Sequence, residues 1–231
     1  MSIADVLVNA TSLVELFKIR MLSVNISPPK PKLTQIQIPG TSDVIDLSES
    51  ISGDIEYDQR ELTVVFEYVG AKESFHAMHS KISNFLHGRK MQIVFSQDSG
   101  FYFLGRLSVD SYKREIYGGT LTLSATVDPY KYETQSSLEP WLWDSFSFED
   151  GIIRDYFDIT VPGSITIIGR RKRVCPKFIC SGAMTVTYLG NTYNLATGEN
   201  IVPDIFLGEG SHILTFGGSG TVSVDYRGAS L

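Results

Sequence analysis

The segment Asp128-Pro129-Tyr130-Lys131-Tyr132 follows a strongly alternating stretch and marks the end of a domain. Between residues 120 and 127, Thr or Ser alternates with Leu, Ala or Val, which is the pattern of a strand with one buried face. Gly118-Gly119 can supply the positive φ of a tight turn, so this strand is predicted to be the second of a hairpin. Pro129 has no N–H to donate and therefore ends the ladder. The polar run at residues 133–137 contains little that could enter a core.

The chain has 231 residues, which is enough for two domains with separate cores. We predict a first domain at residues 1–133, a linker at 134–150 and a second domain at 151–231. The first domain is expected to be rich in strands, with one amphipathic helix at 73–87 whose apolar residues recur at helical spacing. Gly88 is expected to end this helix, because the C′ residue commonly takes a positive φ.

Short apolar stretches separated by glycine-containing turns fill the second domain. Strands are predicted at 164–168, 177–180, 184–188, 205–207, 212–216 and 221–226. Gly217-Gly218-Ser219-Gly220 is expected to be a hairpin loop between the last two strands. Such spacing is typical of an antiparallel β-sandwich. The chain as a whole is therefore predicted to be mainly β.

The charge balance argues against nucleic-acid binding. The chain carries 20 basic and 26 acidic residues, a net charge of −6, whereas a nucleic-acid binder needs clustered Lys and Arg. No apolar run approaches the ~20 residues of a membrane span. The N-terminus has Asp5 and no basic patch before an apolar core, so no signal peptide is predicted. We expect a protein that is made and kept in the cytosol of its host.

The sequence contains no recognisable motif for catalysis or for a cofactor. Neither a Gly-x-Ser-x-Gly elbow nor a phosphate-binding glycine loop occurs. His76, His79 and His87 share one side of the predicted helix, but the helical rise places His87 about 12 Å above His79, too far for one metal ion to bind both. Cys175 and Cys180 are expected to stay reduced. We therefore predict no metal, no cofactor and no enzymatic activity.

Acidic and aromatic side chains are interleaved over residues 141–158. Paired carboxylates beside aromatic rings could serve a glycosidase, but a small sandwich has little room for such a cleft. Two interpretations are simpler: a linker whose aromatics dock the domains, or a platform for sugars.

Arg170-Arg171-Lys172-Arg173 is the one basic cluster of the sequence. It is expected to be either a solvated turn between strands or an electrostatic contact to an acidic neighbour subunit or an anionic cell-wall polymer. Under both interpretations, charge reversal at these four positions should leave folding intact.

A series of short motifs in the first domain resembles the distal tail proteins (Dit) of long-tailed, siphovirus-type bacteriophages and prophages. Each motif is weak alone, but their order over residues 24–132 is that of the family's first domain. The motifs are Pro28-Pro29-Lys30-Pro31, Pro39-Gly40, Asp46-Leu47-Ser48-Glu49, Gly53 with Tyr57, Arg60-Glu61-Leu62, Leu86-His87-Gly88-Arg89-Lys90, Tyr102 with Gly105-Arg106, and Asp128 to Tyr132. Over residues 140–231 the resemblance is only a β-rich pattern that ends in Tyr226-Arg227-Gly228.

This resemblance implies a structural protein of the virion tail tip, or baseplate. Copies of residues 1–133 would form a hexameric ring around the DNA channel, through which DNA passes without specific binding. The ring would join the tail tube protein to the tail-associated baseplate hub protein and to receptor-binding proteins. The second domain would be a sandwich similar to galectins or carbohydrate-binding modules. Candidates for positions that fix the frame or the ring interface are Arg60, Gly88, Arg106, Asp128, Pro129, Tyr130, Lys131 and Tyr132.

Two further expectations concern contacts. Residues 27–45 lack regular periodicity and are expected to be extended, either as an arm that reaches a neighbouring subunit or as a flexible surface loop. Exposed strand edges in residues 91–127 are expected to pair between subunits and line the channel. The alternative function is carbohydrate binding by the second domain through Trp141, Trp143 or Tyr188.

Overall fold

The computed structural model describes residues 4–50, 53–68, 72–115, 118–139 and 151–231. They form two compact units, the first made of Met1–Gln97 with Phe103–Pro129 and the second of Asp98–Tyr102 with Tyr130–Leu231. Strands dominate both units, which confirms the mainly β class.

The division between the units falls at Pro129, a few residues before the predicted boundary at residue 133. The reason is that strand β10 (Lys131–Glu133) pairs with the C-terminal strand β17 (Ala229–Ser230). β10 also pairs with Phe101 and Tyr102, so this short segment belongs to the second unit.

The first unit is built on one antiparallel sheet with strand order β2-β1-β7-β8-β9-β6-β3. Its strands are β1 (Val6–Val8), β2 (Thr11–Ser12), β3 (Ile19–Ile26), β6 (Arg60–Tyr68), β7 (Lys90–Phe95), β8 (Phe101–Glu115) and β9 (Gly118–Val127). The short helix α1 (Leu13–Phe17) joins β2 to β3. The predicted hairpin is formed by β8 and β9, with a bulge between Val109 and Ser111.

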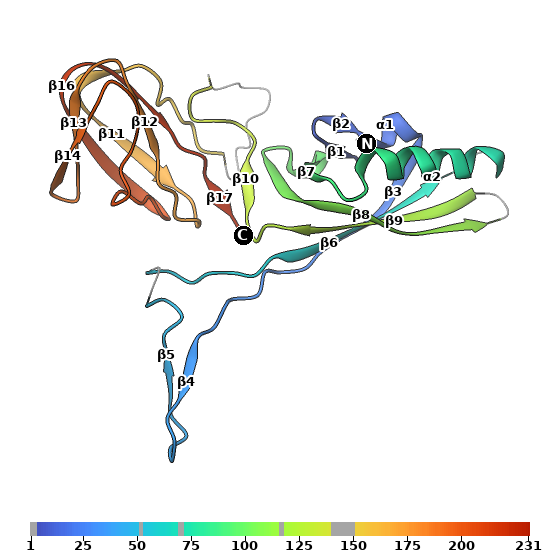
Figure 1. Ribbon diagram of the computed structural model, residues 1–231. Helices are drawn as coiled ribbons and strands as arrows, with labels where there is room; N and C mark the ends of the chain where they lie inside the picture. Colours follow the sequence, from blue (N-terminus) through green and yellow to red (C-terminus); the bar gives the residue numbers. More distant parts are fainter. Residues whose placement is uncertain (1–3, 51–52, 69–71, 116–117, 140–150) are drawn as a thin grey trace. The chain divides into compact units, whose positions relative to one another are not determined.

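Helix α2 (Lys72–Leu86) lies along one face of this sheet (Figure 1) and confirms the predicted amphipathic helix. Its buried residues are Phe75, Met78, Ile82 and Leu86. Gly88 takes φ +77° directly after the helix, as expected of a residue that ends one. The other sheet face carries the Thr and Ser side chains of β9, such as Thr122 and Ser124.

An exposed edge expected in residues 91–127 lies along the outer half of β8. β7 pairs with β1 and with Phe103–Arg106 of β8, and β9 pairs with β8 and β6, whereas Ser108–Glu115 of β8 pair with β9 alone among the described residues. The sheet order ends at β3, which pairs with β6 alone among the described residues.

Residues 27–59 leave the sheet between β3 and β6 and form an arm (Figure 1). The arm is an antiparallel ribbon, so the backbone is extended as expected for residues 27–45, but its paired second leg was not predicted. Its strands β4 (Gln35–Gln37) and β5 (Val44–Asp46) are in register. Backbone hydrogen bonds also join the two legs nearer the sheet, from Lys32 N to Glu56 O at 2.8 Å and from Asp58 N to Lys30 O at 2.8 Å.

The second unit contains an antiparallel sheet of order β14-β13-β16-β12-β15, with β11 added to β16. The strands are β11 (Ile159–Gly169), β12 (Lys177–Cys180), β13 (Met184–Tyr188), β14 (Asn191–Leu195), β15 (Gly198–Ile201) and β16 (Gly210–Asp225). The first part of β16 pairs with β13 and the last part with β12, and both parts line one core that includes Phe178, Phe216 and Val224.

The predicted hairpin loop at residues 217–220 is instead the middle of β16. Gly218 and Gly220 take φ of +117° and +115°, so the strand changes direction without ending. No helix in the described part of the chain is long and apolar enough to cross a membrane.

Candidate functional site

The arm presents apolar side chains that no core covers. Ile36 and Ile45 lie directly opposite each other in the β4–β5 ribbon and are 51% and 47% exposed. Leu33 and Val44 on the same arm are also exposed. An isolated two-stranded ribbon cannot bury such residues by itself and is only marginally stable in water. The arm therefore leaves apolar surface exposed to water, which is typical of contact sites.

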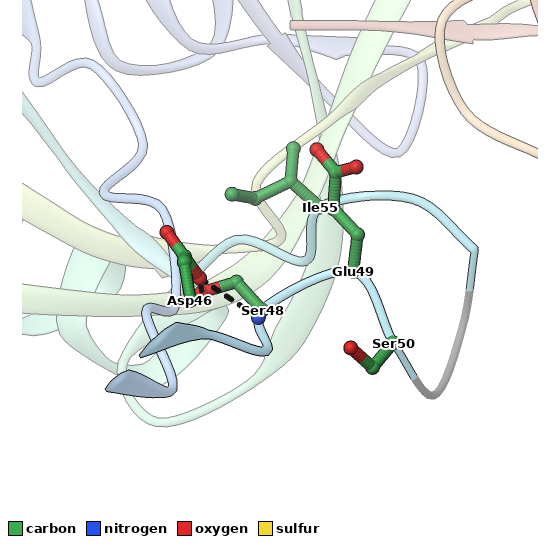
Figure 2. A pocket seen from close by; sticks show the side chains of 5 residues that line it. All are labelled: Asp46, Ser48, Glu49, Ser50 and Ile55. Carbon is green, nitrogen blue, oxygen red and sulfur yellow. Dashed lines mark hydrogen bonds between the residues drawn. The ribbon is translucent and has the colours of Figure 1, made fainter. Parts of the chain in front are cut away.

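The turn after β5 is fixed by Asp46 (Figure 2). Its Oδ1 accepts hydrogen bonds from the backbone N and the Oγ of Ser48, and these bonds lower the pKa of the carboxyl group. Ser48 Oγ in turn accepts a hydrogen bond from Thr34 N at 2.9 Å, which joins the two legs of the arm. An open, largely polar cavity of about 490 Å³ lies here, lined by Asp46, Ser48, Glu49, Ser50 and Ile55. These contacts hold the ribbon in shape where its second leg loops out.

The arm is also the acidic part of the first unit. Residues 27–59 contain six acidic and two basic side chains, whereas the rest of the first unit contains eight acidic and ten basic ones. Within a chain whose net charge is −6, the first unit thus combines an acidic arm with a slightly basic remainder, which we call its body.

Three more exposed apolar side chains lie on the last strand of the sheet and on the helix that precedes it. They are Leu22 and Val24 of β3 and Leu16 of α1. A bulge between Met21 and Ser23 interrupts the pairing of β3 with β6, and Leu22 is the residue left out of the register. We refer to Leu16, Leu22 and Val24, with the free side of β3, as the edge patch.

Three of the predicted frame positions come together beside the central strands β7, β8 and β9. Arg106 Nη1 donates a hydrogen bond to Gly88 O, and both residues line a cavity of about 420 Å³ with Asp128. Arg60 is buried, and its guanidinium group lies 4.9 Å from the centre of the Phe103 ring. Burial lowers the pKa of Arg60, and its Nε has no hydrogen-bond partner in the structure. All of these contacts of Arg60, Gly88 and Arg106 lie within the first unit.

The remaining predicted positions, from Tyr130 to Tyr132, belong to the second unit. Lys131 Nζ forms an ion pair with Asp98 at 2.7 Å. Tyr132 stacks on Tyr102 with ring centres 5.5 Å apart, and its hydroxyl accepts a hydrogen bond from Lys172. The segment is thus held by aromatic and cationic neighbours.

Directly after this segment, Glu133 occupies the centre of a buried ion-pair network. Its carboxylate accepts hydrogen bonds from Arg154 Nη2 at 2.8 Å, Arg154 Nε at 3.0 Å and Gly228 N at 3.0 Å. Arg170 Nε donates a further bond to the same carboxylate. The sequence did not single out Glu133 or Arg154, because a salt bridge between residues far apart leaves no local pattern.

The basic cluster at 170–173 is more than a solvated turn. Arg170 is bound to Glu133 and lies over the Phe101 ring, Lys172 contacts Tyr132, and Arg173 lies over Phe206 at 5.2 Å. Arg171 is half-buried in the same turn. The expectation that all four charges could be reversed without affecting folding is corrected for Arg170, because its partner is a buried carboxylate.

Tyr188 offers no exposed ring to a sugar. It is buried in the second core, with its hydroxyl 2.8 Å from His212 Nδ1. Trp141 and Trp143, the other predicted sugar contacts, lie outside the described residues.

The three histidines of α2 are held by neighbouring side chains and backbone. The ring of His79 lies 4.0 Å from that of Tyr112, and His87 Nδ1 accepts a hydrogen bond from Val109 N. Burial and the nearby His76 lower the pKa of His79. Among the described residues, no group of three or more acidic, histidine or cysteine side chains could hold a metal ion.

Comparison with known proteins places this architecture in one class: the chain has a Dit-like fold. One solved structure that shows this is the Dit protein (gp 19.1) of phage SPP1, described as a paradigm of the hub adsorption apparatus in phages that infect Gram-positive bacteria. The match has a TM-score of 0.67 and covers 100% of both chains at 13% sequence identity. No family model matches the sequence, and no curated protein matches it.

Proposed function

We propose that this chain is a structural distal tail protein of a phage tail tip, one subunit of a hexameric ring that forms a hub around the DNA channel. Its partners are further copies of itself, the tail tube protein, the baseplate hub protein and receptor-binding proteins. The Dit-like fold supports this proposal, and the observation that carries it is the arm of residues 27–59. An ordered acidic ribbon with exposed Ile36 and Ile45 is costly to leave in water and is suited to an assembly contact.

The sheet of the first unit suits a channel lining. One face is covered by α2, whereas the other carries Thr63, Ser108, Thr122 and Ser124 in neighbouring strands. Hydroxyl groups on a face of mixed charge do not bind phosphates as clustered Lys and Arg do. DNA could therefore pass along this face without specific binding.

The test is the solution mass of the purified chain by light scattering over a range of concentrations, with negative-stain imaging of the largest species. We expect a closed ring, or stacked rings, with an axial hole. The double variant Ile36→Glu/Ile45→Glu should reduce the mass to that of a monomer, while circular dichroism shows that both units remain folded.

The matched control is Ile213→Glu, which changes an exposed isoleucine (63%) of the second unit in the same way. It should leave the ring intact. A wild-type chain that is monomeric at every concentration, or an arm variant that assembles like the wild type, would contradict the proposal.

A further inference from the structure

We propose that the arm of one copy docks on the edge patch of a neighbouring copy, so that the β4–β5 ribbon extends the sheet along β3. This inference rests on the proposed function, since it names the surface that receives the arm in the ring. It is argued from three properties of the first unit: where apolar side chains are exposed, where the sheet is open, and how charge is divided.

Exposed large apolar side chains of the first unit gather in two places. In the described residues, four lie on the arm (Leu33, Ile36, Val44 and Ile45), three form the edge patch (Leu16, Leu22 and Val24), and one more is Tyr112. Tyr112 already contacts Phe75, His76 and His79. Contact between an arm and an edge patch would thus remove most of these exposed apolar side chains from water.

The backbone of β3 provides the second argument. β3 is eight residues long and, among the residues that the structure describes, pairs with β6 alone, so its other side presents a row of N–H and C=O groups without a strand partner. Both strands of the β4–β5 ribbon likewise have a free side. Addition of a strand to an open sheet edge satisfies both sets of backbone groups.

Charge is the third argument. The arm carries six acidic and two basic residues, and the edge patch is flanked by the exposed cations Lys18 and Arg20. Arg20 already forms an ion pair with Glu67, which leaves Lys18 as the cation to be tested. The attraction is therefore between an acidic ribbon and a basic body.

The receiving edge belongs to a second copy because of how the arm is attached. The arm is the direct continuation of β3 and β6, and its legs are paired from Ser27 and Glu61 outward, so it leads away from its own edge patch (Figure 1). From Ser27 to the tip at Gly40 an extended chain reaches about 45 Å. The radius of gyration expected of a unit of this size is only about 14 Å. Since the donor and receiver are different surfaces, repetition of the contact is head-to-tail and can close a ring.

Disulfide trapping between differently tagged copies tests this contact. Copies with Ile36→Cys are mixed with copies with Val24→Cys, and, as a control, with copies with Lys81→Cys on the exposed side of α2. Both natural cysteines remain in every variant, so their contribution is the same in each mixture. We expect at least tenfold more mixed dimer with Val24→Cys than with Lys81→Cys. Leu22→Cys provides a second receiving position in case Val24→Cys folds poorly.

The contribution of the Lys18 charge to docking can be measured separately. Lys18→Glu should lower the yield of the Ile36–Val24 disulfide several-fold at low salt, whereas Lys81→Glu should not change it. Two results would contradict docking on the edge patch. One is a mixed-dimer yield that is the same with Val24→Cys and with Lys81→Cys. The other is a higher yield with Thr122→Cys, which lies on the sheet face opposite α2. If light scattering still shows the ring, the proposed function survives that result. A chain that neither assembles nor cross-links at any of these positions would overturn both.

Discussion

Glu133 and Arg154 form a bidentate ion pair in the interior of the second unit, with side chains only 11% and 5% exposed. The pair joins β10 to the segment before β11, and Gly228 and Arg170 complete it. A Cβ atom at Gly228 would lie 2.8 Å from Glu133 Oε2 and 2.9 Å from Arg154 Nη2, so a larger residue at this position would require the ion pair to shift. The network ties the start of the second unit to its C-terminal strand.

Removing one partner of this pair should be strongly destabilising. We expect Arg154→Met to lower the free energy of unfolding of the second unit by about 3–5 kcal/mol, because a buried carboxylate loses two hydrogen bonds. Urea unfolding measures the change. The control is Glu199→Gln at the exposed Lys177–Glu199 pair, which should cost less than about 1 kcal/mol. Similar losses in both variants would mean that the buried network contributes no more than a surface pair.

Charge reversal in the basic cluster should affect folding at one position in particular. Arg170→Glu places a second carboxylate beside Glu133, so we expect loss of the cooperative unfolding transition of the second unit, or a large decrease in its midpoint. Lys177→Glu, a reversal at an exposed site, should shift the midpoint little. If the Arg170→Glu variant were as stable as the wild type, the prediction would be wrong and residues 170–173 would behave as a solvated turn.

The hairpin of the first unit should not tolerate a side chain at Gly119. A Cβ atom there would lie 2.6 Å from two ring atoms of Phe75 and 2.8 Å from Lys113 O. We expect Gly119→Ala to cost about 1–3 kcal/mol in urea unfolding of this unit. Gly100→Ala, where no atom lies within 4 Å of the new Cβ, should change stability by less than about 0.5 kcal/mol. Equal effects would show that Phe75 moves aside freely.

The turn of the arm should be sensitive to acid. Hydrogen bonds from Ser48 lower the pKa of Asp46 below its ordinary value of 3.8. The stabilisation from the ionised carboxylate is thus present above that value and is lost as the pH falls through the lower, folded-state pKa. NMR titration of the Asp46 carboxyl carbon should show the low pKa, and Ser48→Ala should raise it. A titration unchanged by Ser48→Ala would contradict this account of the turn.

His79 should titrate below the ordinary histidine pKa of 6.5, since burial and the nearby His76 both oppose its protonation. The folded first unit therefore binds this proton less readily than the unfolded chain, and its stability should decrease as the pH falls below 6.5. NMR titration of the ring protons measures the pKa directly. His76→Gln should raise the pKa of His79 only in part, because burial is the larger cause. A complete return to 6.5 would show that His76 alone lowers it.

Local patterns in the sequence were sufficient for the elements that alternate or repeat. Strict alternation over residues 120–127 predicted β9, and helical spacing of apolar residues at 73–87 predicted α2 and its end at Gly88. Both succeed because a one-sided core requires a period of 2 in a strand and 3.6 in a helix. The order of short motifs over residues 24–132 indicated a Dit-like protein, and the fold agrees.

The sequence by itself thus determined the class of fold and the main elements of both units, through periodicity and turn residues. Tertiary structure alone decided the rest. Residues 27–59 have no period because the arm has no core of its own, so only the pairing of its legs reveals a ribbon. Glu133 and Arg154 are 21 residues apart and form one buried pair only after the strands around them assemble. The open edge along β3 likewise could not be predicted, because the order of strands in a sheet is set by long-range pairing.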